Sequence, residues 1–126
     1  MTNKIENLFT LTPKKKPNKM NPILFRRNKL INSINKQIQN INDLQRGLKV
    51  RNLWFFNDED NNFYLIIKYG KSELELSKNK YSIMCKNIDE VLDSLVKVKE
   101  LVSNGHFDLT LTDVSKNIRQ NFKSNS

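Results

Sequence analysis

The 126-residue chain contains no alanine, three glycines, three prolines, one cysteine and one histidine. A single cysteine, Cys85, cannot form an internal disulfide, which excludes the disulfide scaffold of many small secreted domains. One cysteine and one histidine (His106) also cannot complete a tetrahedral zinc site on one chain. No apolar run approaches the roughly 18 residues that a membrane-spanning helix needs, and the N-terminus lacks the apolar segment of a secretory signal. We therefore expect an intracellular protein that does not associate with membranes.

Signatures of catalysis are equally scarce. The chain has neither a glycine-rich phosphate loop nor a Gly-x-Ser-x-Gly nucleophile motif. Cys85 lies in an alternating apolar segment, where a thiol normally acts as a small core hydrophobe. The acidic run at residues 58–60 lacks the spacing and the glycine of a calcium loop, and is typical of a solvated turn. We predict no catalytic residues, no metal site and no cofactor, and therefore a protein that is not an enzyme.

Acidic residues are nearly missing from the first 52 positions. That segment holds twelve lysines and arginines against two acids, whereas residues 53–126 hold ten against eleven. A coding bias toward Lys, Asn and Ile accounts for lysine throughout the chain, but not for this shortage of acids. It also does not explain why four of the five arginines fall in the first segment. Clustered cations favour binding to a polyanion, because they release counterions from a phosphate backbone.

The length indicates one domain, preceded by a basic arm. Prolines and like charges in residues 1–21 predict a flexible, extended segment. Residues 22–122 form the predicted α+β domain, and residues 123–126 a frayed tail. The arm carries one apolar cluster, which is either a docking motif or, the reading we favour, a strip that packs on the domain itself. This cluster consists of Ile5, Leu8, Phe9 and Leu11.

A long helix is predicted from residue 22 to about residue 46. Asn21 is a suitable N-cap and Pro22 a suitable first helical residue, and Gly47 is a natural stop. Apolar residues recur at steps of three and four from Ile31 to Leu48, which indicates one buried helix face. We expect this stripe to contact the protein's own core, and a dimeric coiled coil is the alternative.

Strand patterns follow the helix. Four segments rich in aromatic, β-branched or alternating apolar residues predict an antiparallel four-stranded meander. Gly70-Lys71 predicts a two-residue hairpin between the second and third of them. Asn87 and Glu90 then open a helix that ends at Gly105 and covers one face of the sheet, and a short helix from Thr112 or Asp113 closes the domain. The four strands are predicted at residues 53–56, 63–69, 72–77 and 81–85.

Several of these segments together resemble a family of small basic proteins of unknown function from bacteria and their phages. The resemblance covers about residues 20–110. It implies the domain boundaries and a phage-related origin, but no mechanism. The expected location is the cytoplasm of a bacterium or of a phage-infected cell. The segments are Pro22 with Arg-Arg-Asn-Lys-Leu-Ile at 26–31, the Trp-Phe strand, Ile-Lys-Tyr-Gly-Lys at 67–71, the Leu-Glu-Leu strand, and Leu-Val-Ser-Asn-Gly-His-Phe-Asp at 101–108.

The order of arm, meander and helix also resembles the single-stranded-DNA-binding transcriptional coactivators. In that family a dimer presents curved sheets to unpaired DNA, and a basic arm precedes the domain. The long helix between arm and sheet departs from the family pattern. Glu73 and Glu75 would repel phosphate if their face of the sheet were the binding face.

The function predicted from the sequence is binding of nucleic acid with little sequence preference. Single-stranded nucleic acid is favoured, and DNA and RNA both stay open, as does a homodimer. The alternative is a phage accessory factor that binds a protein partner through the arm or the long helix. Predicted phosphate contacts are Lys14, Lys15, Lys16, Lys19, Arg26, Arg27, Lys29, Arg46 and Arg51. Predicted base-stacking residues are Trp54, Phe56, Tyr64 and Tyr69, of which at least two are expected in the core.

Overall fold

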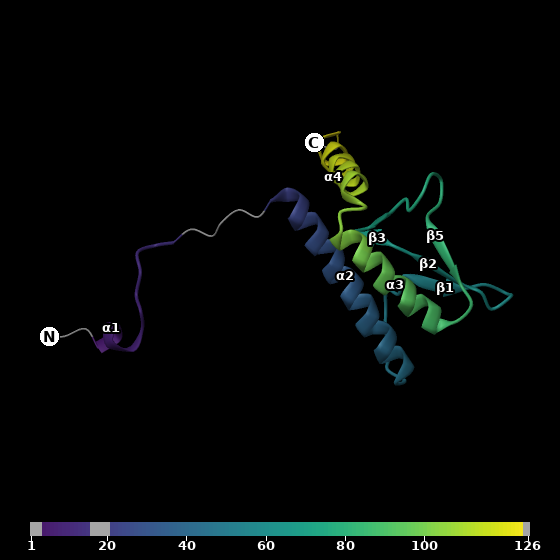
Figure 1. Cartoon of the computed structure of the whole chain (residues 1–126), viewed down its shortest axis with the longest axis horizontal. Coiled ribbons are helices and arrows are strands. Elements are labelled where there is room, and N and C mark those ends of the chain that lie inside the picture. Colours follow the sequence, from purple (N-terminus) through teal and green to yellow (C-terminus); the bar gives the residue numbers. More distant parts are fainter. Residues whose placement is uncertain (1–3, 16–20, 125–126) are drawn as a thin grey trace.

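A computed structural model of the chain describes residues 4–15 and 21–124. Three long helices pack with a small antiparallel sheet, which confirms the predicted α+β class. Helices α2 (Pro22–Gln45) and α3 (Ile88–Ser103) lie side by side against the strands, and α4 (Asp108–Ser124) leaves from the same end of the helix layer (Figure 1). The core therefore lies between the helix layer and one face of the sheet.

Helix α2 begins and ends where the sequence predicts. The Asn21 side chain accepts a hydrogen bond of 2.8 Å from the Ile23 N–H, and Gly47 adopts a φ of +85° just beyond the last turn. Leu30, Ile34 and Ile41 are fully buried in the core. The apolar stripe of α2 thus contacts the protein's own core, as predicted, rather than lying exposed as a coiled-coil seam.

The predicted four-stranded meander is confirmed only in part. Strands β1 (Phe55–Asn57), β2 (Phe63–Ile66) and β5 (Ser82–Cys85) form a three-stranded sheet in the order β1-β2-β5. Strands β3 (Lys68–Tyr69) and β4 (Ser72–Glu73) form a separate two-stranded ladder. The segment predicted as one strand at 63–69 is therefore divided between two partners.

The reason lies in a second tight turn after β4. The Leu76 N–H donates to the Lys80 carbonyl, a Ser77–Lys80 bridge follows, and Asn79 adopts a φ of +61°. Residues 76–80 thus pair with one another, and β4 stays short. The hairpin predicted at Gly70-Lys71 is confirmed, because it joins β3 to β4.

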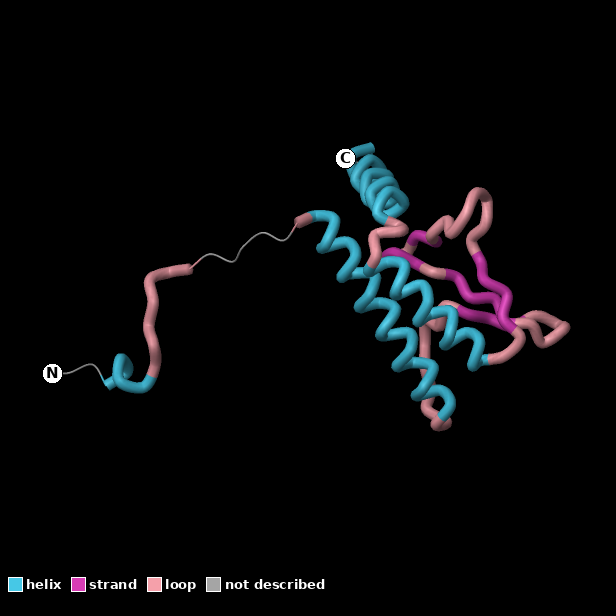
Figure 2. Tube along the Cα trace, viewed as in Figure 1, coloured by secondary structure: helices cyan, strands magenta, loops and turns pink. Residues whose placement is uncertain are grey.

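The two faces of the three-stranded sheet differ. Leu65 and Cys85 are buried on the face that α2 and α3 cover (Figure 2). Because side chains alternate along a strand, the cross-strand set Phe56, Tyr64 and Met84 lies on the opposite face. We call these three residues the outer row. Phe56 is 55% exposed and Met84 is 66% exposed.

Helix α3 matches its prediction, and α4 corrects one. The Asn87 side chain caps α3 by accepting from the Glu90 N–H at 2.9 Å, and the helix buries an apolar face against the sheet. The short C-terminal helix predicted from Thr112 or Asp113 is instead 17 residues long and starts at Asp108. It starts earlier because Phe107 and Leu111 are buried in the core, so the chain is already packed at its first turn.

The described part of the arm contains α1 (Lys4–Leu8), a five-residue helix where an extended segment was predicted. Ile5, Leu8, Phe9 and Leu11 are each more than half exposed. The favoured prediction, that these residues pack on the domain, is therefore wrong. The arm presents an apolar cluster to the solvent.

Candidate functional site

The arginines near the start of α2 connect two helices. The Arg27 guanidinium donates two hydrogen bonds, of 2.8 and 2.5 Å, to the Asp108 carboxylate at the start of α4. Arg26 donates to the Thr112 hydroxyl at 3.1 Å. Both arginines were predicted as phosphate contacts, but the structure gives their side chains half-buried partners within the protein.

The charges of this pair compensate each other. The hydrogen bonds from Arg27 lower the pKa of Asp108 below its ordinary value of 3.8, although partial desolvation opposes the change. The same hydrogen bonds raise the pKa of Arg27. Both groups are therefore charged at neutral pH, and the attraction of Arg27 for an external anion is reduced by its neighbour.

The other predicted cations are scattered. Arg46 donates to Asp43 at 2.8 Å within the last turns of α2, and Arg51 is exposed in the loop before β1. Lys14 and Lys15 are exposed in the arm. Lys16 and Lys19 lie outside the described residues.

One predicted cation, Lys29, lines a hollow of about 340 Å³ between α2 and the β-strands. A second lysine of α2, Lys36, lies on the same hollow two helical turns further along. None of the eight described residues that line it is acidic. We call it the cationic hollow; its lining residues are Lys29, Asn32, Ser33, Lys36, Gln37, Asn52, Trp54 and Gly70.

A buried glutamine builds the wall of this hollow. Gln37 is 5% exposed; its Nε2 donates to the Asn52 carbonyl at 2.9 Å, and its Oε1 accepts from the Trp54 N–H at 3.0 Å. Asn52 itself has a φ of +60°, which turns the chain toward β1. These two hydrogen bonds hold the segment that carries Trp54 against α2, because a buried peptide group needs a partner.

The hollow combines charge with an aromatic ring. Lys29 and Lys36 are seven residues apart, so their helix positions differ by about 10.5 Å along the axis. The Lys29 ammonium lies 4.7 Å from the centroid of the Tyr69 ring, a cation–π contact. The half-buried Trp54 lines the same hollow. Such a site suits a phosphate-bearing ligand with an aromatic part.

The predicted stacking residues divide into two groups. Trp54 lines the cationic hollow. Tyr69 is 5% exposed, packs in the core, and contacts the Lys29 ammonium with its ring. Phe56 and Tyr64 stack on each other in the outer row, with ring centroids 5.7 Å apart. The Tyr64 hydroxyl donates to Asp58 at 3.0 Å. This hydrogen bond raises the pKa of Tyr64 and places a carboxylate beside the middle residue of the row.

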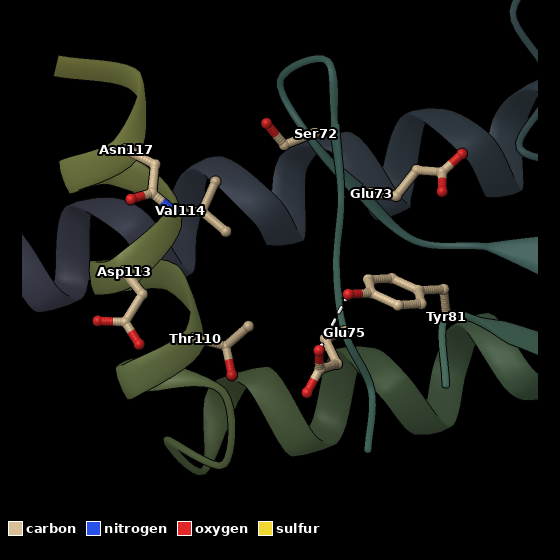
Figure 3. A pocket seen from close by; sticks show the side chains of 8 residues that line it. All are labelled: Ser72, Glu73, Glu75, Tyr81, Thr110, Asp113, Val114 and Asn117. Atoms are coloured by element: carbon tan, nitrogen blue, oxygen red, sulfur yellow. Dashed lines mark hydrogen bonds between the residues drawn. The ribbon is translucent and has the colours of Figure 1, made fainter. Parts of the chain in front are cut away.

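A second hollow, of about 370 Å³, has the opposite charge (Figure 3). Glu73 and Glu75 reach it from the segment that contains β4, and Asp113 from α4. The Tyr81 hydroxyl donates to Glu75 at 2.9 Å, which raises the pKa of Tyr81. Three carboxylates repel phosphate, so this second hollow does not suit an anionic ligand.

Besides Gln37 and Gly70, the lining residues that the sequence analysis missed as site residues are Lys36, Asn32, Ser33 and Asn52. For the three on α2 a signal existed, because positions 29, 32, 33 and 36 share one helix face. For Asn52 it did not, since that residue reaches the hollow only through the hydrogen bond to Gln37.

Comparison of the chain with protein-family models, with curated proteins and with solved structures found no match. The two resemblances noted in the sequence stay predictions. In the part of the chain that the structure describes, no group of three or more acidic, cysteine or histidine side chains is arranged to hold a metal ion. Among the helices of the same residues, none combines the length and apolar content needed to cross a bilayer.

Proposed function

We propose that the protein binds single-stranded nucleic acid with little sequence preference, and that the cationic hollow is the binding site. The observation that carries this proposal is that Lys29, Lys36 and Trp54 line one hollow with no acidic residue in its lining. The alternative anion sites are weaker, because Arg26, Arg27 and Arg46 already bind partners within the protein.

Binding in this site uses two kinds of contact. The ammonium groups of Lys29 and Lys36 attract phosphates of one strand and release counterions from it. A base stacks on the Trp54 indole, which tolerates any base because every base has a π face. Arg51 and Lys71 are exposed cations adjacent in sequence to the lining residues Asn52 and Gly70, and they extend the positive surface along the strand.

This site differs from the one that the coactivator resemblance implies. In that family the strand lies on a sheet, whereas here the exposed sheet face has Asp58 beside its aromatic row. A hollow on the helix side keeps the phosphates away from that carboxylate. We propose a non-enzymatic role in a bacterial or phage-infected cell, as the resemblance to the bacterial and phage family implies.

The test uses the only tryptophan of the chain, Trp54. Titration with a single-stranded oligothymidylate is expected to quench its fluorescence, and the affinity is expected to fall as salt rises. The variant Lys29→Ala/Lys36→Ala removes two phosphate contacts. It is expected to weaken binding about tenfold or more and to reduce the salt slope by about 1.4, since each contact contributes about 0.7.

The matched control is Lys78→Ala/Lys80→Ala. It removes the same charge from an exposed turn outside the hollow, and is expected to change the affinity much less. Equal losses in the two variants would show that only net charge matters and would refute the placement of the site. The absence of any binding at low salt would refute the function itself.

A further inference from the structure

The outer row is unusually apolar for the exposed face of a sheet in a two-layer protein. The exposed face of an antiparallel sheet is normally polar, because it faces water. Here the register places Phe56, Tyr64 and Met84 opposite one another on that face, and two of the three are more than half exposed. Such a face is expected to be covered by another apolar surface.

An acidic turn lies beside the middle residue of this row, Tyr64. The Asp58 carboxylate accepts a hydrogen bond from the Tyr64 hydroxyl, and the exposed Glu59 and Asp60 follow it in the turn. Partial desolvation acts to raise the pKa of Asp58, but hydrogen bonds from Asn62, Tyr64 and Asp60 together lower it. The turn therefore stays negatively charged. An apolar face beside an acidic turn suits a ligand that is apolar and basic, and it disfavours nucleic acid.

The arm has that composition. Ile5, Leu8, Phe9 and Leu11 are exposed, and the exposed Lys14 and Lys15 follow them closely. Helix α1 has only five residues, and a helix this short is not stable in water on its own. The apolar cluster of the arm therefore requires a surface to pack on, and the order apolar then basic matches the order of the outer row and the acidic turn.

We propose that the arm of one copy of this protein docks on the outer row of a second copy. The apolar cluster Ile5–Leu11 covers Phe56, Tyr64 and Met84, and Lys14 and Lys15 lie beside the turn at residues 58–60. The exchange is reciprocal, so it produces a symmetric dimer in which each arm covers its partner's sheet.

A second copy fits better than the chain's own sheet. Leu30 is the first fully buried residue of α2, and Pro22 lies about 12 Å before it along the helix axis. Residues 22–25, at the start of the helix, are exposed. In Figure 2 these first turns project away from the strands. Residues 12–20 span at most about 30 Å. To reach its own outer row, the arm must return along α2 and then pass around both layers of the domain. An arm that enters from a partner has the same length, but it does not have to pass around the domain on which it docks.

The first experiment measures the mass of the full-length protein by sedimentation equilibrium without nucleic acid. The wild type is expected to be a dimer. Leu8→Glu/Phe9→Glu in the arm and Met84→Glu in the outer row are each expected to raise the dimer dissociation constant at least about tenfold, because each buries a charge in the interface. The control is Leu109→Glu on α4, where an even more exposed apolar residue is outside the proposed interface. It is expected to leave the dimer intact.

The second experiment reverses the charges. Lys14→Glu/Lys15→Glu gives an arm and a turn that are both acidic, and Glu59→Lys/Asp60→Lys gives an arm and a turn that are both basic. Each variant alone is expected to dissociate more readily than the wild type. An equimolar mixture is expected to restore the dimer, because both arm-to-turn contacts are then between opposite charges.

These outcomes decide the proposal. A wild type that is monomeric at all concentrations overturns the proposal. If hydrogen exchange in β5 of such a monomer rises in Leu8→Glu/Phe9→Glu, the outer row is covered by the chain's own arm. A dimer that survives the arm substitutions, or a mixture that does not re-form one, also overturns it. Thermal unfolding of each variant separates a lost interface from a lost fold.

Discussion

Replacing Gln37 by methionine is expected to test how the cationic hollow is built. Methionine has nearly the volume of glutamine, so packing changes little. It cannot donate to the Asn52 carbonyl or accept from the Trp54 N–H, the two groups that Gln37 satisfies at 2.9 and 3.0 Å. The substitution therefore leaves two backbone groups beside a buried position without partners.

The size of the effect follows from those two groups. A buried polar group without its partner costs about 1–3 kcal/mol. The loop that carries the Asn52 carbonyl and the Trp54 N–H is only half-buried in part, so water will form some of the hydrogen bonds that Gln37 no longer makes. We therefore expect Gln37→Met to lower the free energy of unfolding by about 2–4 kcal/mol. For a domain of this size that corresponds to a decrease in Tm of roughly 10 °C or more.

Chemical denaturation followed by Trp54 fluorescence measures this loss. The emission of the folded variant is also expected to shift to longer wavelength, because the segment that carries the indole is no longer held on α2. Gln37→Glu is the control. A protonated glutamate can make both hydrogen bonds, but an ionised one loses the bond to the Asn52 carbonyl.

The pH dependence of Gln37→Glu follows from the raised pKa that such a buried carboxyl acquires. A group whose folded pKa is raised favours the folded state at low pH, and this contribution is lost as pH rises through the folded value. The variant is therefore expected to approach wild-type stability at acidic pH and to lose stability toward neutral pH. A loss below about 0.5 kcal/mol for Gln37→Met, with unchanged emission, would refute the role assigned to Gln37.

Two further predictions concern the junction of α2 and α4. Gly105→Ala is expected to destabilise the protein by more than Gly47→Ala. Both residues have a φ near +86°, which costs an alanine about 1–2 kcal/mol. Only at Gly105 does the added Cβ also meet Arg27 at 2.6 Å and Asp108 at 2.9 Å. Equal losses of unfolding free energy would refute this. Asp108→Asn is expected to flatten the acid side of the stability profile. The lowered pKa of Asp108 stabilises the fold above the ordinary value of 3.8, and this is lost as pH falls through the folded value. Denaturation of both proteins from pH 6 to pH 2 measures it, and parallel profiles would contradict it.

The sequence by itself determined the elements whose ends are set by local chemistry. Asn21 with Pro22 and Asn87 with Glu90 start their helices through hydrogen bonds or dihedral preferences within a few residues. Gly47, Gly70 and Gly105 end elements through positive φ values. The alternation of buried leucines with exposed glutamates around β4 was also readable, because it depends only on the period of a strand.

Tertiary structure decided how long the strands are and how far the last helix extends. The division of residues 63–69 depends on a turn at residues 76–80 that pairs with itself. The start of α4 at Asp108 depends on the burial of Phe107 and Leu111 and on the bond to Arg27. The pairing within residues 76–80 is local, but which strands β2 and β3 then pair with is decided by the sheet as a whole. The bond from Arg27 to Asp108 joins segments far apart in the chain, and no local pattern encodes it.

The candidate site shows the same division. The sequence placed a basic surface on the long helix, because Asp43 is its one acidic residue. It did not separate Lys29, which lines the hollow, from Arg26 and Arg27, which bind α4. That distinction depends on which face of α2 the strands and α4 occupy. A charge count gives the sign of a surface, but only the packing of helices on the sheet determines which charges have partners within the protein.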